Sequence, residues 1–269
     1  MQLRMPGELA SSYKSPAQQT RVVSEAWGEE NLYCPNCPSQ RLARSEPNTE
    51  AVDFTCPECR DPFQLKSQSH RISNRILDAG YMAMYRAIVS DRRPNLFALH
   101  YDRSVWQVVD VLLVPRFVFS LSCIEARRRL APTARRHDWV GCNIVLANIP
   151  PDARIPVVTD SAVVNAATVR ERFARLRPLE KLGYEARGWT LDVLNVVRSL
   201  GREDFSLADV YARSPELARL HPRNLHVHDK IRQRLQRLRD LGLLEFLGRG
   251  RYRVSGPGFW ESGMGNRNR

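Results

Sequence analysis

The sequence predicts a mixed α/β domain over residues 1–182, followed by a smaller domain over residues 183–254 in which helices precede a β-hairpin. Two observations carry this prediction. In the first part, apolar residues alternate with polar ones in some segments and recur at helical spacing in others, as in an α/β core. In the second part, amphipathic helical patterns lead into two short alternating segments around a glycine-bracketed turn. Residues 255–269 are rich in Gly, Asn and Arg, and we expect a disordered tail there.

The composition indicates an anionic partner. The 269 residues include 41 Lys and Arg against 29 Asp and Glu, which gives a formal net charge of +12 and a pI near 9.9. Nucleic acid or a membrane surface would satisfy such a charge. Residues 1–10 contain no apolar signal-peptide core, and Asp110 interrupts the longest apolar run, 108–114, so we expect no membrane span and a cytoplasmic protein.

Local periodicity predicts the elements of the first domain. Apolar residues recur at helical spacing between Val22 and Trp27, and they alternate with polar residues on both sides of Cys56. Pro94 and Pro115 are expected to stop the elements before them. The predicted order is a loose start 1–15, a helix 18–27, strands 52–55 and 63–66, a helix 73–90, strands 96–101 and 106–114, a basic binding loop 127–143, strands 144–147 and 155–158, a helix 165–175 and a linker 178–188.

Four cysteines in two Cys-x-x-Cys pairs predict a metal site. Each pair, Cys34 with Cys37 and Cys56 with Cys59, can turn two sulfur atoms toward one point, and the loop between the pairs can fold back. In a reducing cytoplasm such pairs bind metal or carry out redox chemistry. Four cysteines leave no open coordination position, so zinc here would be structural. The alternative is four buried or redox-active thiols; Cys123 and Cys142 are expected to be buried free thiols.

A possible catalytic constellation surrounds the second cysteine pair. Asp53, Gln64 and Lys66 share the polar face of the two strands predicted on either side of it. A carboxylate, an amide oxygen and the carbonyl of Leu65 can hold Mg²⁺ against a phosphate oxygen, while a lysine beside them positions or activates a water molecule. The sequence therefore permits phosphodiester hydrolysis. An acid and a lysine on a strand face can equally be ordinary solvated side chains.

The second domain has the pattern of a winged helix-turn-helix. A first helix begins near Trp189 and ends at Gly201, and Ser206 with Asp209 predicts the N-terminal cap of a second helix. A third helix spans about 226–241 and buries an apolar stripe at Val227, Ile231, Leu235 and Leu238. Segments 244–246 and 252–254 then form a hairpin with a basic tip.

The third helix and the hairpin predict a DNA-binding surface. Glutamine can grip adenine in the major groove, and arginine can reach phosphate or guanine. The alternative is a solvated helix face in a winged helix that binds protein. The residues expected to contact DNA in this domain are His226, Arg232, Gln233, Gln236 and Arg237 on the helix, together with Arg249 and Arg251 in the wing.

Several motifs together resemble the DpnI family of methyl-directed type II restriction endonucleases, over about residues 12–254. The longest shared motif is Leu-Ala-Pro-Thr-Ala-Arg-Arg at 130–136, followed by Trp139. The others are Tyr-Cys-Pro-Asn-Cys at 33–37, Val-Asp-Phe at 52–54 leading into Cys56 and Cys59, Leu-Lys-Ser at 65–67, Gly-Cys-Asn-Ile at 141–144, Arg-Gly-Trp-Thr at 187–190, Lys-Ile-Arg-Gln at 230–233 and Gly-Arg-Gly-x-Tyr-Arg at 248–253.

The resemblance implies a PD-(D/E)xK nuclease domain with an embedded zinc site, followed by a winged-helix domain that also contacts DNA. It implies Mg²⁺-dependent double-strand cleavage at GATC sites whose adenine carries an N6-methyl group. Asp53 matches the first metal-binding acid and Lys66 the catalytic lysine, whereas Gln64 stands where the family has an acidic residue. An amide oxygen can bind Mg²⁺ but brings no negative charge.

Reading a methyl group requires an apolar contact, and burying one methyl group is worth about 1 kcal/mol. Trp139, beside the expected DNA contacts Arg135 and Arg136, is the candidate for this contact in the nuclease domain, with a core tryptophan as the alternative. We expect a monomer in solution. Two other functions stay open: a methylated-DNA sensor whose nuclease site is weakened by Gln64, and a zinc-stabilised RNA-binding protein.

Overall fold

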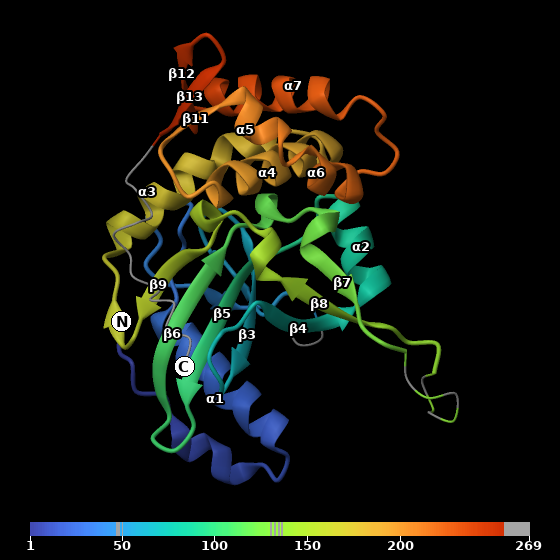
Figure 1. Ribbon diagram of the computed structural model, residues 1–269. Helices are drawn as coiled ribbons and strands as arrows, with labels where there is room; N and C mark the ends of the chain where they lie inside the picture. The colour runs from blue at the N-terminus through green and yellow to red at the C-terminus, as the bar shows by residue number, and fades with distance from the viewer. Residues whose placement is uncertain are drawn as a thin grey trace, which may run out of the picture. The chain divides into compact units, whose positions relative to one another are not determined.

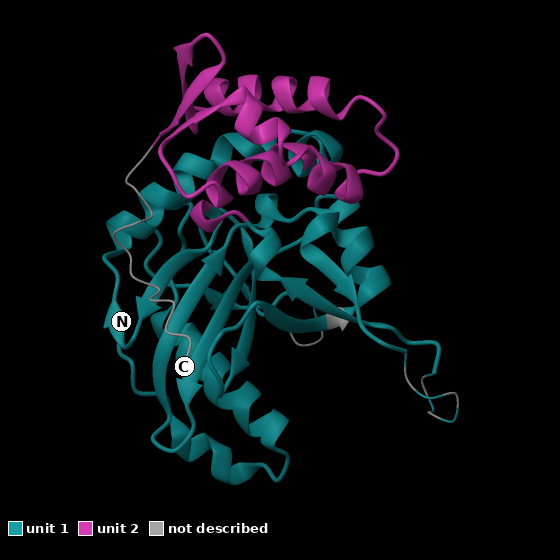
Figure 2. Ribbon diagram, viewed as in Figure 1, with its two compact units in different colours: residues 1–149, 153–188 teal, residues 150–152, 189–269 magenta. Residues whose placement is uncertain are grey.

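The computed structural model describes residues 1–46, 49, 51–129, 131, 133, 135 and 137–255. The chain divides into two compact units (Figure 2): the first comprises residues 1–149 and 153–188, the second residues 150–152 and 189–269. Of the predicted tail, only Ser255 lies within the described residues.

The first unit is built on a seven-stranded mixed sheet (Figure 1). The pair β3–β5 is parallel, and the other neighbouring strands are antiparallel. In spatial order, the strands are β1 (Ala43–Arg44), β2 (Phe54–Thr55), β3 (Pro62–Gln68), β5 (Asn95–Asp102), β6 (Gln107–Val114), β9 (Ile155–Thr159) and β10 (Ala162–Val163).

The central strands are buried because they are nearly continuous runs of β-branched, leucine and aromatic side chains. Leu96, Leu99 and Leu113 have no exposed surface, and the rings of Phe63 and Phe97 stack with centroids 5.6 Å apart. The core of the unit therefore lies around β3, β5 and β6. The strands predicted at 63–66, 96–101, 106–114 and 155–158 are confirmed within a few residues.

A second sheet has three strands, and its first strand, β4, lies in the connection from β3 to β5. It has the order β4–β8–β7, with β4 at Arg75–Gly80, β8 at Gly141–Val145 and β7 at Ile124–Ala126. The helix α2 (Tyr81–Val89) packs on this sheet (Figure 1). The predicted helix 73–90 is therefore wrong in its first half, where Ile76 and Asp78 belong to a strand that pairs with β8. The predicted loop 127–143 likewise includes the start of β8.

The first fifteen residues are ordered against the first unit, so the prediction of a loose start is wrong. A 3₁₀ helix, η1, spans Gly7–Ser12, and Arg4 forms a β-bridge with Gln107. The indole Nε1 of Trp27 donates a hydrogen bond to the carbonyl of Gln2 at 2.8 Å. The helix α1 (Pro16–Asn31) buries Trp27 and packs against β3, in agreement with the helix predicted at 18–27.

Short 3₁₀ turns and a further helix complete this unit. The helix α3 (Ala166–Leu176) begins at an Asn165 cap, whose side chain accepts a hydrogen bond from the backbone of Ala167 at 2.8 Å, and packs against β9. The predicted linker 178–188 is not irregular: it contains most of η6 and the first turn of α4. The 3₁₀ turns are η2 (Arg116–Val118), η3 (Leu121–Cys123), η4 (Leu146–Asn148), η5 (Pro151–Ala153) and η6 (Arg177–Lys181).

The second unit contains the helices and the hairpin that were predicted, with one additional helix. The predicted cap is present: the side chain of Ser206 accepts a hydrogen bond from the N–H of Asp209, whose carboxylate accepts one in return from the N–H of Ser206. The elements are α4 (Tyr184–Ser199), which begins in the first unit, β11 (Asp204–Ser206), α5 (Leu207–Tyr211), α6 (Ser214–Leu220), α7 (Val227–Asp240), β12 (Leu244–Gly248) and β13 (Arg251–Val254). The three strands form one sheet in the order β11–β13–β12.

Candidate active site and metal centre

The four paired cysteines converge in the first unit. The Sγ atoms of Cys34, Cys37, Cys56 and Cys59 all lie within 4.8 Å of one another. Those of Cys34 and Cys59 are 3.6 Å apart, and those of Cys37 and Cys56 are 3.4 Å apart. Tetrahedral coordination with Zn–S bonds of about 2.3 Å separates the sulfur atoms by about 3.8 Å. The predicted cluster is confirmed, and its composition and spacing fit a four-cysteine metal site.

The thiols of this cluster differ in pKa. Burial raises the pKa of Cys34, and it raises that of Cys37 to about 11. At Cys56 burial is outweighed by the backbone N–H groups of Cys59 and Glu58, which lower the pKa to about 7. A cation bound at the centre of the cluster would favour the thiolate form of all four, because it stabilises their negative charge.

Hydrogen bonds hold the two cysteine turns together. The side-chain Nδ2 of Asn36 donates to Oδ2 of Asp61 at 2.9 Å, and the N–H of Cys56 donates to the carbonyl of Asp61 at 2.9 Å. From α3, the Nε of Arg170 donates to the carbonyl of Cys34 at 3.1 Å. The cluster is therefore fixed both to its own hairpin and to a helix more than a hundred residues further along the chain.

The second cysteine pair forms the turn of a hairpin that carries the candidate catalytic residues. Phe54 on β2 pairs with Phe63 on β3. Just before β2, the N–H of Asp53 donates to the carbonyl of Phe63 at 2.9 Å, and Oδ2 of Asp53 accepts a hydrogen bond from the N–H of Leu65 at 2.7 Å. Burial raises the pKa of Asp53, although the hydrogen bond from Leu65 opposes the shift. The structure thus brings Asp53 against β3.

Two further oxygens belong to β3, the strand against which Asp53 lies: the backbone carbonyl of Leu65 and the side-chain Oε1 of Gln64. Strand residues two apart direct their backbone groups to the same edge, so the carbonyl of Leu65 faces the edge at which Asp53 lies. The side chain of Gln64 is buried, with the residue 5 % exposed, and its Oε1 has no hydrogen-bond partner among the described residues. Leaving a buried acceptor unsatisfied costs about 1–3 kcal/mol, so a cation or a donor at this point would be stabilising.

Lys66 contacts an acid that the sequence did not identify. Its Nζ lies 2.8 Å from Oδ1 of Asp78 on β4, and Oδ2 of Asp78 lies 3.4 Å from Nη1 of Arg93. Asp78 was missed because the segment 73–90 was predicted to be one helix, which would have placed it away from β3. No alternating pattern marks the strand in the sequence, because Ile76 and Leu77 are adjacent apolar residues, so local periodicity did not separate Asp78 from the following helix.

The recognition surface predicted in the second unit is largely exposed. On α7, Ile231, Leu235 and Leu238 are buried as predicted, whereas Val227 is only half-buried and Arg234 is buried instead. Among the predicted DNA contacts, Arg237 is half-buried and the others are exposed: His226, Arg232, Gln233, Gln236, Arg249 and Arg251. Arg249 occupies the tip of the β12–β13 hairpin with a φ of 46°.

Two protein-family models match the chain. The DpnI model, described as the Dam-replacing family, matches residues 1–182, and the DpnI C-terminal model, described as the Dam-replacing HTH domain, matches residues 185–254. The chain belongs to the DpnI family. The predicted resemblance is therefore confirmed, and with it the coarser conclusions that the first part is related to nucleases and that the second part is a helix-turn-helix domain suited to DNA binding.

In this DpnI-family chain, Trp139 packs over the β4–β8 pair. A Cβ atom added to Gly80 would lie 3.2 Å from Nε1 of Trp139, and one added to Gly141 would lie 3.1 Å from its Cη2. The indole is half-buried, so it covers the backbone of both strands while part of it stays accessible. Arg135 is exposed in the preceding turn, and Arg136 lies outside the described residues.

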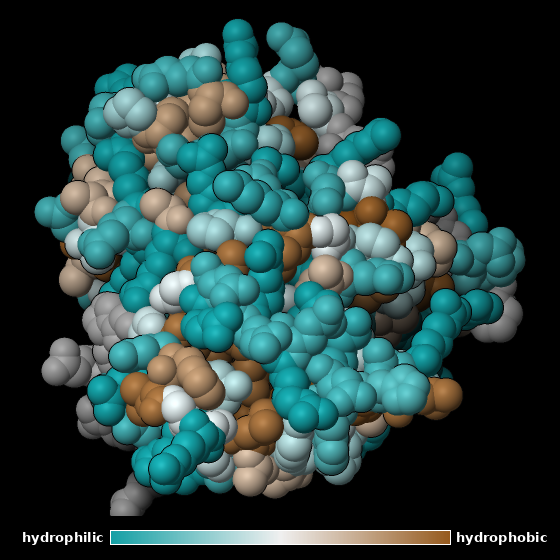
Figure 3. Space-filling view, turned by 90° about the horizontal axis from the view of Figure 1, so that it is seen from above, coloured by the Kyte–Doolittle hydropathy of each residue, from teal (hydrophilic) through white to brown (hydrophobic). Residues whose placement is uncertain are grey.

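The surface of this DpnI-family chain is dominated by polar side chains on the face drawn in Figure 3, where hydrophobic side chains occur in small separate groups. Within the part of the chain that the structure describes, no helix is long and apolar enough to cross a membrane. The match of residues 185–254 to a helix-turn-helix domain suggests DNA binding, which agrees with the formal net charge of +12.

Proposed function

We propose that the protein is a methyl-dependent type II restriction endonuclease, which makes Mg²⁺-dependent double-strand cuts in DNA at GATC sites containing N6-methyladenine. The observation that carries the proposal is the placement of Asp53, Gln64 and Lys66 on one hairpin of the unit matched by the DpnI family. This arrangement supports a PD-(D/E)xK nuclease, with Gln64 in place of the acid that the family has at this position. We propose that the protein is a monomer in solution.

A structural zinc ion is proposed at the four cysteines. Four sulfur ligands complete its coordination, so no position remains for water or substrate. Zinc there would stabilise the fold and would take no direct part in the reaction. Because Cys56 and Cys59 form the turn between β2 and β3, the ion would hold the two sides of the hairpin in register. The catalytic residues would then depend on zinc for their position.

Magnesium is proposed beside Asp53. The residues present fit it: Mg²⁺ prefers oxygen ligands, and the carboxylate of Asp53, the unsatisfied Oε1 of Gln64 and the carbonyl of Leu65 would supply them. When bound, the ion would supply positive charge to a phosphate oxygen of DNA. Gln64 contributes no negative charge, so Asp53 is the one carboxylate among these three ligands.

The proposed role of Lys66 follows from its ammonium group. Its Nζ carries positive charge and three donors at the partly exposed end of the side chain, which is 26 % exposed. In this position it would bind a non-bridging phosphate oxygen or hold the attacking water in line with the scissile bond. Orientation of this kind contributes to phosphodiester hydrolysis without any covalent intermediate on the protein.

Recognition of the site is proposed to come from both units. In the nuclease unit, Trp139 would contact the N6-methyl group, and Arg135 and Arg136 would contact the DNA backbone. In the helix-turn-helix unit, glutamine would read adenine in the major groove, and arginines would bind phosphate or guanine. The residues proposed for the second unit are His226, Arg232, Gln233, Gln236 and Arg237 on α7 and Arg249 and Arg251 in the wing.

A plasmid digest tests this function. The same plasmid is prepared with and without adenine methylation at GATC, and each is incubated with purified protein and Mg²⁺. We expect linear fragments only from methylated plasmid, no cutting in EDTA, and much slower cutting by Lys66→Ala than by the native protein. If methylated plasmid stays intact with native, zinc-loaded protein, the proposal is wrong.

The alternative function is a methylated-DNA sensor with a weakened nuclease site. It is favoured by one observation, the neutral Gln64 at the position where the family has an acid. The variant Gln64→Glu separates the two. Cleavage by both the native protein and the variant supports the nuclease, whereas cleavage by the variant alone, with equal binding of methylated DNA by both proteins, supports the sensor.

A further inference from the structure

We infer that Asp78 is a positioning residue of the candidate active site, whose carboxylate fixes the ammonium group of Lys66 and is itself fixed by buried Arg93. This inference rests on the proposed nuclease function and deepens it. Asp78 belongs to β4, outside the hairpin and outside the three candidate catalytic residues.

The contact between Asp78 and Lys66 joins two different sheets. Lys66 lies on β3 of the seven-stranded sheet, and Asp78 lies on β4 of the three-stranded sheet. Oδ1 of Asp78 and Nζ of Lys66 are 2.8 Å apart, and the Asp78 side chain is only 4 % exposed. Solvent therefore screens this ion pair much less than it screens a surface pair.

Arg93 holds the other oxygen of Asp78. Its Nη1 lies 3.4 Å from Oδ2 of Asp78, and its side chain is 5 % exposed. The guanidinium also stacks over the ring of Phe119, with its carbon atom 3.9 Å from the ring centroid. Packing on an aromatic ring and burial leave Arg93 few alternative rotamers, so it is a rigid anchor for the carboxylate.

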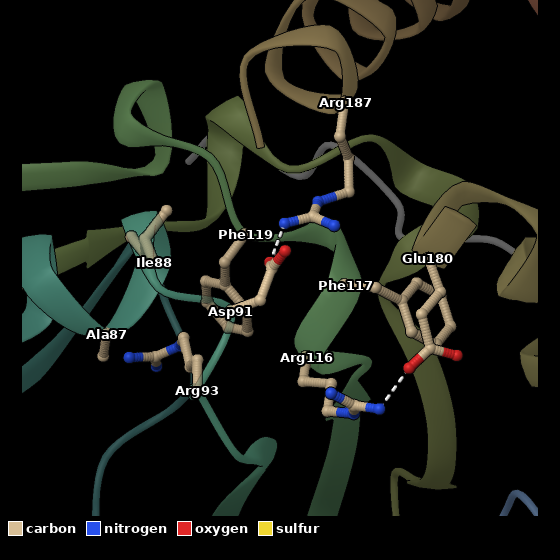
Figure 4. Close-up of a pocket in the computed structure, with 9 residues that line it drawn as sticks. All are labelled: Ala87, Ile88, Asp91, Arg93, Arg116, Phe117, Phe119, Glu180 and Arg187. Carbon is tan, nitrogen blue, oxygen red and sulfur yellow. Dashed lines mark hydrogen bonds and ion pairs between the residues drawn. The ribbon is translucent and has the colours of Figure 1, made fainter. Parts of the chain in front are cut away.

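The neighbouring charges do not compete for Arg93. Arg93 lines a pocket of the first unit that also contains two other arginines and two acids (Figure 4). Each of these acids pairs with one of the other arginines: Asp91 with Arg187, and Glu180 with Arg116. Among the residues that the structure describes, Arg93 forms its ion pair with Asp78. The charge sequence Arg93, Asp78, Lys66 thus leads from the core of the unit to the candidate active site.

A fixed carboxylate has a specific use next to Lys66. A lysine side chain has four rotatable bonds. If it stayed mobile beside a phosphate, its conformational entropy would be lost each time the ammonium group took up the orientation that the reaction needs. Asp78 supplies a counter-charge on the side of Lys66 that faces β4, which restricts Nζ to a small volume. In a purely structural role, the same carboxylate would stabilise the fold but would not affect the reaction through Lys66.

A double-mutant cycle distinguishes the two roles. Cleavage of a methylated GATC duplex is measured under single-turnover conditions, with zinc-loaded protein in excess, for the native protein, Asp78→Asn, Lys66→Ala and the double variant. We expect Asp78→Asn to lower the rate constant about a hundredfold, the scale of a misplaced catalytic group. Binding of the duplex in EDTA should change less than about twofold, since Asp78 is buried. In the Lys66→Ala background, Asp78→Asn should have no further effect.

Two further variants guard against loss of folding. Asp78→Asn leaves Arg93 buried without its counter-charge, which can destabilise the unit. The double variant Asp78→Asn/Arg93→Met removes both charges and should show the same loss in rate constant at a restored melting temperature. Asp110→Asn is the matched control, because Asp110 forms a 2.8 Å ion pair with His100 within the same unit but does not contact Lys66. Its rate constant should equal that of the native protein.

The outcomes separate this inference from the proposed function. Cleavage by the native protein together with an unchanged rate constant in Asp78→Asn overturns the positioning role and leaves the nuclease function standing. An equal, additional loss in the Lys66→Ala background also overturns it, because Asp78 would then act independently of the lysine. No cleavage of methylated DNA by the native protein overturns the proposed function first, and the inference with it.

Discussion

Two candidate metal sites share the β2–β3 hairpin, and the chain builds them in different ways. The cysteine cluster takes all four ligands from two short turns, and a hydrogen bond that Asn36 donates to Asp61 joins those turns directly. The oxygen site beside Asp53 also begins in the hairpin, but the position of Lys66 depends on Asp78 from another sheet. The first site is fixed by local chain geometry, whereas the second needs the whole unit to be packed.

The two sites also differ in charge. Four thiolates bring more negative charge than a zinc ion needs, so the cluster can compensate its metal completely. Beside Asp53, the other proposed ligands, Gln64 and the carbonyl of Leu65, are neutral. The cysteine site should therefore bind its metal tightly and permanently, and the oxygen site should bind its metal weakly and exchange it.

Removal of zinc should have the largest effect, because it acts on both sites. Structural zinc contributes about 10–16 kcal/mol of binding free energy in small zinc-dependent folds. We expect Cys34→Ser or treatment with a strong chelator to abolish cleavage, even after Mg²⁺ is restored. Metal content by mass spectrometry, thermal unfolding and plasmid cleavage are the measurements.

The control for zinc removal is Cys142→Ala, since Cys142 is buried on β8 outside the cluster. It should keep one zinc ion per chain and retain cleavage. Full activity in a chain without zinc would contradict the idea that the hairpin depends on the cluster.

Replacement of Lys66 should affect one site only. Lys66→Ala is expected to lower the single-turnover rate constant about 10²–10⁴-fold, the usual contribution of a positioned acid–base group, while zinc content and binding of methylated DNA stay unchanged. Gln68→Ala, further along the same strand, is the matched control and should cleave normally. Loss of zinc from Lys66→Ala would show that the two sites are not separable.

The difference between a site fixed by local chain geometry and one that depends on packing also explains which residues could be predicted from the sequence. The cysteine cluster and the Ser206–Asp209 cap depend on spacing within a few tens of residues, and both were predicted correctly. Asp78 could not be, because its contact with Lys66 is made by the packing of β4 against β3. In segment 73–90, Ile76 and Met84 fit a helical pattern as well as a strand followed by a helix, and only pairing with β8 decides between them.

The N-terminal segment was missed for a related reason. Its polar composition predicted a loose start, but Met5 is buried and the carbonyl of Gln2 accepts a hydrogen bond from Trp27. These contacts are made with residues that are distant in the chain, so no local sequence pattern predicts them. The resemblance alone implied that Gln64 stands at the position of an acid, whereas its unsatisfied oxygen became visible only in the folded hairpin.

A change of charge at position 64 should sharpen the contrast between the sites. Gln64→Glu adds a carboxylate next to Asp53, and we expect the Mg²⁺ concentration for half-maximal cleavage to fall about tenfold, which corresponds to about 1.4 kcal/mol. Zinc content should not change. A titration of cleavage rate against Mg²⁺ measures the effect, and Gln68→Glu is the control for added negative charge on the same strand. A rise in the required Mg²⁺ would argue against a ligand role for residue 64.

The smallest expected effect comes from the wing, which belongs to neither metal site. Arg249 is exposed at the tip of the β12–β13 hairpin, where a phosphate contact would attract DNA without reading its sequence. Arg249→Ala should weaken binding of methylated and unmethylated duplexes equally and reduce the slope of log affinity against log salt by about 1. Fluorescence anisotropy at several salt concentrations measures both quantities.

Arg253→Ala is the control in the same hairpin, because the Nε of Arg253 is committed to Asp204 at 2.7 Å and is not expected to reach phosphate. Its salt slope should match that of the native protein. Neither arginine variant should change the Mg²⁺ requirement or the single-turnover rate constant at saturating protein, since the proposed Mg²⁺ ligands lie on the β2–β3 hairpin. If Arg249→Ala altered the Mg²⁺ requirement, the cation site would extend beyond the hairpin and its proposed ligand set would be incomplete.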